Sequence, residues 1–153
     1  MIRLATRSDI PQTADLICEF LQDNGSYQAH TGEIDPNHVR RLVYSIIHQG
    51  YIWLLFNGPI AVGLLAAVRE PNIWIPQQVS LRELVWYVKE EYRNSVGAGR
   101  LFVKFCQQGS QLLEQGEIFA YFTTKMTTTG DYDLERRGFR PTETLYMRDQ
   151  EGE

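Results

Sequence analysis

The sequence EEYRNSVGAGRL, residues 90–101, combines positively charged side chains with small, flexible ones just before a run with helical spacing. A helix N-terminus has unpaired N–H groups and about half a positive charge, so small residues there let an anion approach the backbone. Arg93 and Arg100 add positive charge on either side of the glycines. The stretch therefore predicts a phosphate cradle. An equally good interpretation is that Gly97 and Gly99 only permit a tight strand-to-helix turn.

Two familiar phosphate-binding loops are excluded. The chain has no G-x-x-x-x-G-K-[ST] sequence, which a P-loop requires. The glycines also follow a predicted hairpin, whereas a dinucleotide-binding loop follows the first strand of its fold. A phosphate site in this stretch must therefore be of another kind.

The length and charge of the chain limit its class. With 153 residues, 43% of them hydrophobic, it is long enough for one domain with a real core. Fifteen basic residues against nineteen acidic ones give a net charge of -4, and the pI is about 5.4. The chain lacks the excess of basic residues that is typical of a nucleic-acid-binding protein, so we expect no nucleic-acid partner.

No stretch of the sequence predicts a membrane span or a metal site. The longest apolar runs, 51–56 and 60–68, are far shorter than the ~20 residues that cross a bilayer. The N-terminus has no secretory apolar region, so we expect a soluble, cytoplasmic protein. Cys18 and Cys106 lie in helix-like patterns and are predicted to be reduced, buried thiols. The three histidines are scattered, and we expect no metal.

The first part of the chain predicts a strand and two helices. Residues 2–6 alternate in polarity, and Ser8 is a good N-cap for a helix with apolar residues on one face. Asp35 and Pro36 form the start signal of a second amphipathic helix, which ends near Gly50.

The remainder predicts an alternation of strands and helices. Asn57 and Gly58 tolerate the positive φ angles of a tight hairpin between two strands. Further strands are predicted at 80–90, 117–124 and 142–148, and helices at 101–113 and 131–137, the last stopped by Gly138. The order β-α-α-β-β-β-α-β-α-β indicates an α/β (α+β) fold, a mixed sheet with helices packed on it.

This order and these residues together resemble the GNAT acetyltransferase superfamily over essentially the whole chain. The likeness lies in IRLATRSDI, in ELVWYVKEEYRNSVGAGRL and in LERRGFRPTETLYMR. It implies a mostly antiparallel central sheet of about six to seven strands flanked by four helices, in one domain of residues 1–148 with a frayed tail at 149–153. The sequence ELVWYV…YR further resembles a group of GNAT proteins often encoded by bacteriophages. This resemblance would place the protein in the host cytoplasm.

The resemblance implies that acetyl-CoA is the co-substrate and that the glycine loop binds its pyrophosphate. The family pattern is Gln/Arg-x-x-Gly-x-Gly/Ala, whereas Arg93 lies four residues before Gly97. Either the loop has one extra residue, or Asn94 takes the place of the arginine. The implied cofactor-binding residues are Tyr87, Val88, Arg93, Asn94, Ser95, Val96, Gly97, Ala98, Gly99, Arg100 and Thr127.

The resemblance also implies catalytic groups. Glu83 lies where the family often has a catalytic glutamate, which would take a proton from an amine acceptor. The alternative is a solvated residue at the start of a strand. A backbone N–H near Val88 would polarise the thioester carbonyl.

The general acid is not evident from the resemblance. The family's tyrosine position holds Leu134, and Tyr132 is two residues away, about 200° around a helix, so we expect it to point elsewhere. Tyr132 is nevertheless a candidate catalytic residue. Tyr87, Tyr121 and Tyr146 are candidate replacements, and otherwise the thiolate leaves unassisted.

The implied function is N-acetyl transfer to an amine of a small molecule or protein, by a monomer or homodimer. One alternative is a GNAT-shaped binding module, phage-encoded and aimed at a host protein, that keeps CoA without turnover. The other is a toxin that acetylates charged tRNA, which the acidic balance disfavours. The loop residues Ile73, Trp74 and Ile75 either cover an acceptor or fill the core.

Overall fold

The computed structural model describes residues 1–23, 33–124, 132–144, 146 and 148. Three short 3-10 turns, η1 (Arg7–Asp9), η2 (Glu90–Tyr92) and η3 (Glu135–Arg137), accompany the helices and strands. The helices and strands are β1 (Ile2–Leu4), α1 (Ile10–Asp23), α3 (Pro36–Gln49), β2 (Gly50–Asn57), β3 (Ile60–Pro71), β4 (Val79–Val88), α4 (Val96–Glu114) and β5 (Ala120–Phe122).

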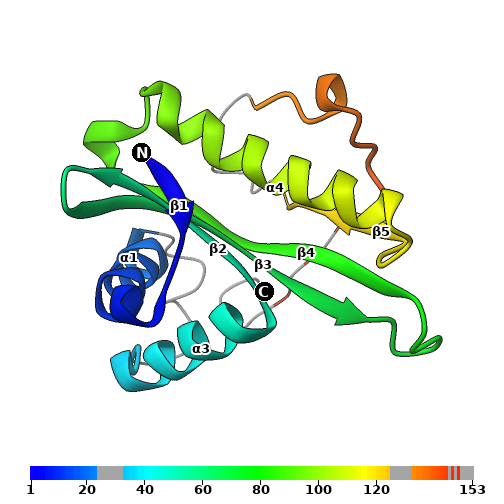
Figure 1. Ribbon diagram of the computed structural model, residues 1–153, viewed down its shortest axis with the longest axis horizontal. Helices are drawn as coiled ribbons and strands as arrows, with labels where there is room; N and C mark the ends of the chain where they lie inside the picture. The colour runs from blue at the N-terminus through cyan, green and yellow to red at the C-terminus, as the bar shows by residue number, and fades with distance from the viewer. Residues whose placement is uncertain (24–32, 125–131, 145, 147, 149–153) are drawn as a thin grey trace.

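The strands form one sheet in the order β1-β2-β3-β4-β5. The first three pairings are antiparallel, and β4 pairs with β5 in parallel. Helices α1 and α3 cover one face of the sheet and α4 covers the other, so the molecule has three layers (Figure 1). One apolar core lies on each side of the sheet, because β2, β3 and β4 bury side chains on both faces.

Local sequence features explain where several elements begin. The Asp35 carboxylate accepts a hydrogen bond of 2.9 Å from the Asn37 amide, and Pro36 is the first residue of α3, as predicted. Gly58 has a φ of +59° in the turn between β2 and β3, which confirms the predicted hairpin. Cys18 and Cys106 are free, as predicted, although both are half-buried rather than buried.

The start of α1 differs from its prediction. The chain enters α1 through the η1 turn, and Thr6, not Ser8, is the residue that precedes this turn. The Thr6 amide donates a 2.7 Å hydrogen bond to Asp9 Oδ2, and Arg3 pairs with the same oxygen at 2.7 Å. Asp9 therefore fixes the entry to the helix two residues earlier than the sequence pattern suggests.

The prediction of six to seven strands and four helices is wrong for the described residues, which form five strands and three α-helices. The predicted helix at 131–137 is only the η3 turn, ended by Gly138 at a φ of +86°. Residues 141–144 are exposed and belong to no strand. The edge strand β5 is only three residues long and so offers few backbone groups to a further strand.

Candidate active site

A β-bulge in β4 decides which side chains face each core. The register with β3 shifts between Ala66 and Ala67, so that Leu84 is an extra residue on β4. A one-residue slip turns every following side chain to the other face. Leu81 accordingly packs in the core beneath α4, whereas Val85 packs in the core beneath α1 and α3.

Strands β4 and β5 part just before this bulge. Their pairing runs from Ser80 opposite Ala120 to Arg82 opposite Phe122, where β5 ends. Strand β4 continues to Val88. From Glu83 onward, β4 therefore has no strand partner on this side among the described residues.

Along this open edge, the backbone N–H and C=O groups of alternate residues point away from β3. The Lys89 amide donates a 2.9 Å hydrogen bond to the Val62 carbonyl, which marks a hydrogen-bonded pair between β4 and β3. Because such pairs alternate along antiparallel strands, the N–H and C=O groups of Val88 and Trp86 point away from β3. The Val88 carbonyl accepts a 2.8 Å hydrogen bond from Arg93 Nε. Tyr87, in contrast, directs its backbone groups toward β3.

Glu83 lies at the point where the two strands part, and its side chain is buried. The residue is only 8% exposed. Its Oε2 atom accepts hydrogen bonds from the Thr123 hydroxyl at 3.0 Å and from the Thr124 amide at 3.3 Å. Its Oε1 atom has no hydrogen-bond partner in the part of the chain that the structure describes. The interpretation of Glu83 as a solvated residue is therefore wrong, and one carboxylate oxygen is available for a proton.

The surroundings of Glu83 change its acidity. Burial raises the pKa of this carboxyl group above its ordinary value of 4.5, because a charged group loses its hydration inside the protein. The hydrogen bonds from Thr123 and Thr124 oppose this effect, since both stabilise the charged form. The raised pKa makes Glu83 a better proton acceptor than an exposed glutamate.

In the turn before α4, some backbone N–H groups donate hydrogen bonds within the described part of the protein and others do not. The Ser95 amide donates to the Tyr92 carbonyl at 3.1 Å, and the Ala98 amide donates to the Ser95 carbonyl at 3.2 Å. The amides of Val96 and Gly97 have no acceptor among the described residues, as expected for the first turn of a helix. Two N–H groups at the positive end of the α4 dipole are thus available to an anion.

The space around the two glycines of the loop differs. A Cβ atom at Gly97 would lie 2.6 Å from Leu55 Cδ1, so Gly97 lets α4 pack closely on β2. A Cβ atom at Gly99 would meet nothing within 4 Å. Next to this open space, Arg100 is exposed and has no ion-pair partner among the described residues. Neither glycine has a positive φ, so the turn itself does not require them, and the anion site at this loop stays a prediction.

Arg93 connects three parts of the structure. Besides its bond to the Val88 carbonyl, its guanidinium lies 3.4 Å from Asp23 Oδ2 at the end of α1. It also lies 5.6 Å from the centre of the Tyr87 ring. These contacts hold the start of the loop against α1 and β4, and Asn94 next to it is exposed.

The Tyr87 side chain faces α1 rather than α4. Its hydroxyl donates a 2.9 Å hydrogen bond to Asp23 Oδ2, and Glu19 Oε2, 3.4 Å away, is a second acceptor for the same proton. Burial, followed by the hydrogen bond to Asp23, raises the pKa of Tyr87 to about 12. A hydroxyl that is held by two carboxylates is a poor proton donor to another group.

Tyr132, expected to point elsewhere, packs against β4. Its ring lies edge-on to Trp86 at 4.9 Å and to Phe102 at 5.2 Å. Its hydroxyl is buried and has no hydrogen-bond partner among the described residues, and burial raises the pKa of Tyr132. The argument from helical spacing fails because Tyr132 precedes the η3 turn and lies in no helix.

The other candidates lie apart from this region or outside the described residues. The Tyr121 hydroxyl lies 3.3 Å from Ser110 Oγ on α4. Tyr146 is exposed, and Thr127 is outside the described residues. Among the described residues no group of His, Cys, Asp and Glu is arranged to hold a metal ion, and no helix is long and apolar enough to cross a membrane.

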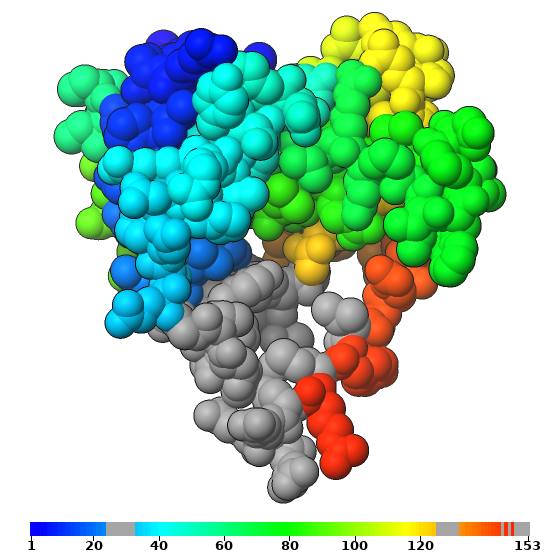
Figure 2. Space-filling model, turned by 90° about the horizontal axis from the view of Figure 1, so that it is seen from below, coloured from blue at the N-terminus to red at the C-terminus, as the bar shows by residue number. Residues whose placement is uncertain are grey.

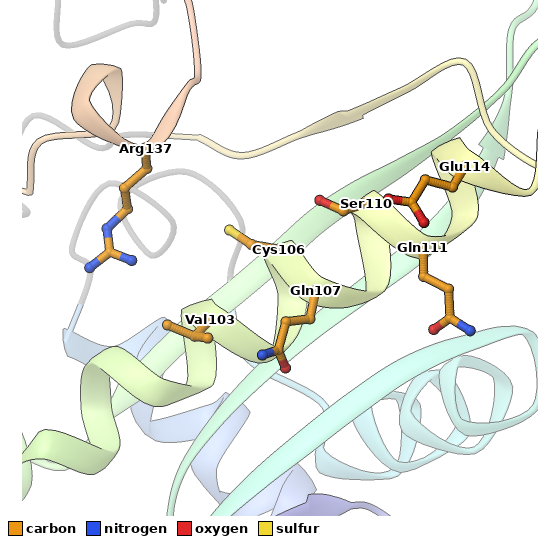
Figure 3. A pocket seen from close by; sticks show the side chains of 7 residues that line it. All are labelled: Val103, Cys106, Gln107, Ser110, Gln111, Glu114 and Arg137. Atoms are coloured by element: carbon orange, nitrogen blue, oxygen red, sulfur yellow. The ribbon is translucent and has the colours of Figure 1, made fainter.

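A groove of about 450 Å³ lies on α4, away from Glu83 and the glycine loop. Its lining runs along α4 from Val103 to Glu114, and Arg137 reaches toward it from the η3 turn (Figure 3). None of the candidate residues named above from β4 or the loop lines it. The groove therefore does not include Glu83 or the glycine loop, although Arg137 in its lining lies 4.8 Å from the centre of the Tyr132 ring.

The residues that the sequence did not predict come from its least regular features. Thr123 and Thr124 follow a three-residue strand, and nothing in their sequence context indicates that they contact Glu83. The bulge at Leu84 has no glycine or proline to announce it. Asp23 is found only once the fold brings the end of α1 beside the end of β4.

The fold resembles solved acetyltransferase structures along nearly the whole chain. A Trypanosoma brucei acetyltransferase has a TM-score of 0.69 at 14% identity, with 97% of this chain and 98% of that chain covered. A predicted acetyltransferase from Clostridium acetobutylicum, solved with acetyl-CoA, has a TM-score of 0.68 at 12% identity, with 97% and 95% covered. A GNAT family acetyltransferase from Staphylococcus aureus has a TM-score of 0.63 at 16% identity, with 97% of each chain covered.

No protein-family model and no curated protein matches the sequence. None of the three names above refers to a bacteriophage, so the phage association stays a prediction. The likeness in structure, at such low identity, concerns the fold. The chain therefore has the fold of the GNAT acetyltransferases.

Proposed function

We propose that the protein is an acetyl-CoA-dependent N-acetyltransferase that moves an acetyl group to an amine of a small molecule or protein by direct attack. The observation that supports it most is the open edge of β4, which begins at the buried carboxylate of Glu83 and leads to the free amides of α4. The second half of β4 and the turn after it thus connect the proposed acid-base group to the proposed anion site at the start of α4.

The cofactor fits the described residues at its phosphate end. Val96 and Gly97 offer unpaired amides, the space over Gly99 is open, and Arg100 supplies a free positive charge. Acetyl-CoA, when bound, supplies an acetyl thioester. Ser95 and Ala98 contribute shape rather than hydrogen bonds, because their amides are already used.

Glu83 acts on the acceptor amine in this proposal. A lysine-like amine has a pKa of ~10.4 and is almost entirely protonated at neutral pH, so it must lose a proton before it attacks. Glu83 Oε1 accepts that proton, directly or through a water molecule, while the donors on Oε2 hold the carboxylate in place. The Val88 N–H points to the open edge and donates to the carbonyl oxygen as its charge grows.

Tyr132 is the proposed donor to the departing thiolate. Its hydroxyl is buried and unpartnered among the described residues, and its ring rests on Trp86 of β4. The competing tyrosines are less suitable. The Tyr87 hydroxyl has two carboxylates as acceptors, and Tyr121 lies beside Ser110 on α4.

The proposal is tested by incubating the protein with acetyl-CoA and a panel of amines, and by measuring free thiol release together with the mass of the acetylated product. Transfer that depends on Glu83 supports the proposal. Binding of acetyl-CoA without transfer to any amine or protein of a cell lysate would instead indicate a module that only keeps the cofactor. Absence of binding at millimolar acetyl-CoA would contradict both.

A further inference from the structure

The loop between β3 and β4 presents three large apolar side chains to solvent. Ile73, Trp74 and Ile75 are 82%, 85% and 47% exposed, which excludes the prediction that they fill the core. The hairpin projects beyond the helices on both faces of the sheet (Figure 1). From the α1 and α3 side, the green segment forms the right-hand edge of the molecule (Figure 2). The loop precedes β4 and thus lies at the opposite end of that strand from the α4 loop.

The loop is held in one conformation by its own hydrogen bonds. The Asn72 side chain accepts the amides of Trp74 and Ile75 at 2.8 and 3.0 Å. The Asn72 backbone N–H donates to the Gln78 backbone carbonyl at 2.8 Å, and the Gln78 backbone N–H donates to the Ile75 carbonyl at 2.9 Å. The apolar side chains are therefore presented on an ordered backbone, which lowers the entropy lost when a partner binds.

A further exposed apolar side chain lies near the base of the loop, just before β5. The Phe119 amide donates a 2.9 Å hydrogen bond to the Val79 carbonyl, which places Phe119 beside the base of the loop. Its side chain is 50% exposed and lies edge-on to Phe122 at 6.2 Å. We call Ile73, Trp74, Ile75 and Phe119 the hairpin patch.

The charges that flank the hairpin patch cancel in pairs. Arg82 Nε lies 2.6 Å from Glu70 Oε2, and an Arg69 nitrogen lies 2.9 Å from Glu117 Oε2. No excess of positive charge is present in this part of the structure, as a nucleic acid or an anionic membrane would require. A surface without net charge adds no electrostatic repulsion when it meets its own copy across a two-fold axis.

We infer that the hairpin patch is a self-association surface, through which the protein binds a second copy of itself. A neutral border around exposed aromatic and aliphatic side chains matches a self-facing contact, in a protein whose overall charge of -4 otherwise opposes association. Trp74 is the central anchor, because it is the largest and most exposed member of the patch.

The size of the patch sets the strength of the contact. Aromatic side chains cover about 150–250 Å² each, so the four residues offer on the order of 500 Å² per chain. Two such surfaces bury roughly 1,000 Å² in total, which is the lower limit for a specific interface. The predicted dimer is therefore weak and reversible, and it forms at high micromolar concentrations.

Sedimentation velocity over about 5 to 500 μM protein tests the inference, because this range spans the dissociation constants of small interfaces. We expect the sedimentation coefficient of the wild type to rise toward that of a dimer. The W74S variant should stay monomeric throughout, and its fold should not change because Trp74 contacts solvent. The I60S variant is the matched control, since Ile60 is 58% exposed on the other hairpin.

Each possible outcome either supports or overturns the inference. Concentration-dependent dimerisation of the wild type and I60S, but not of W74S, supports the inference. A wild type that stays monomeric at the highest concentration overturns it, as does a W74S variant that dimerises like the wild type. Equal loss of association in W74S and I60S would also overturn it, because the effect would then not belong to the hairpin patch.

Discussion

The Thr123 hydroxyl donates a 3.0 Å hydrogen bond to Glu83 Oε2, and this contact joins β4 to the chain that follows β5 at the point where the two strands part. The bond stabilises the charged carboxylate against the cost of its burial. Thr123 is thus a positioning residue for the proposed base, and it acts through Glu83 rather than on the acceptor.

Replacing Thr123 with valine should shift the pH dependence of the reaction. The T123V variant keeps a side chain of similar shape but loses the donor, so the pKa of Glu83 rises further and the acid limb of the kcat/KM profile moves to higher pH. The T123S variant keeps a hydroxyl and should retain the wild-type profile. An unchanged acid limb in T123V would show that Thr123 does not tune the base.

The stability of the wild type relative to the E83Q variant should fall as the pH rises. The raised pKa of Glu83 means that the native state binds a proton more readily than the unfolded chain. The free energy of unfolding of the wild type therefore falls as the pH rises from about 4.5 through the raised pKa, and E83Q lacks this decline. Urea unfolding of both proteins across this range checks the prediction, and parallel curves would contradict it.

Gly97 should tolerate substitution poorly for a reason unrelated to the cofactor. The Cβ atom of G97A would lie 2.6 Å from Leu55 Cδ1, so we expect a loss of about 1–3 kcal/mol in the free energy of unfolding. The loss should shrink when Leu55 is also replaced by alanine, which a double-mutant cycle measures. G99A, where the space is open, is the control and should not be destabilised. Additive effects at Gly97 and Leu55 would refute the packing argument.

The Y132F variant should separate catalysis from stability. Its hydroxyl has no partner among the described residues, so its removal should leave the free energy of unfolding unchanged or raise it. As the proposed proton donor, Tyr132 should nevertheless contribute a factor of roughly one hundred to the transfer rate. Y121F is the control and should transfer at the wild-type rate. Wild-type activity in Y132F would remove Tyr132 from the mechanism.

Much of the fold was predictable because short-range chemistry determines it. Asp35 and Pro36 start α3, Asn57 and Gly58 turn the β2–β3 hairpin, and the glycine loop precedes α4. In each case the residues that form the feature are neighbours in the sequence. Local hydrogen bonds and steric limits are therefore enough to specify them.

The unpredicted parts depend on contacts between distant segments. The bulge at Leu84 appears only in the pairing of β4 with β3, and the partners of Glu83 come from the chain after β5. Helical spacing does not locate the Tyr132 side chain, because the chain around it makes only the η3 turn. The sequence predicted the residue types of the site, but only the fold determines which of them face the open edge of β4.

Calorimetric titration with CoA of the G99E variant tests the central claim, which is that the N-terminus of α4 binds the diphosphate of the cofactor. The G99E substitution would place a negative side chain in open space beside the free amides of Val96 and Gly97 without a packing clash. We predict that the wild type and G99A bind CoA and that G99E, with an unchanged circular dichroism spectrum, binds at least tenfold more weakly. Equal affinity of G99E and the wild type would contradict the account.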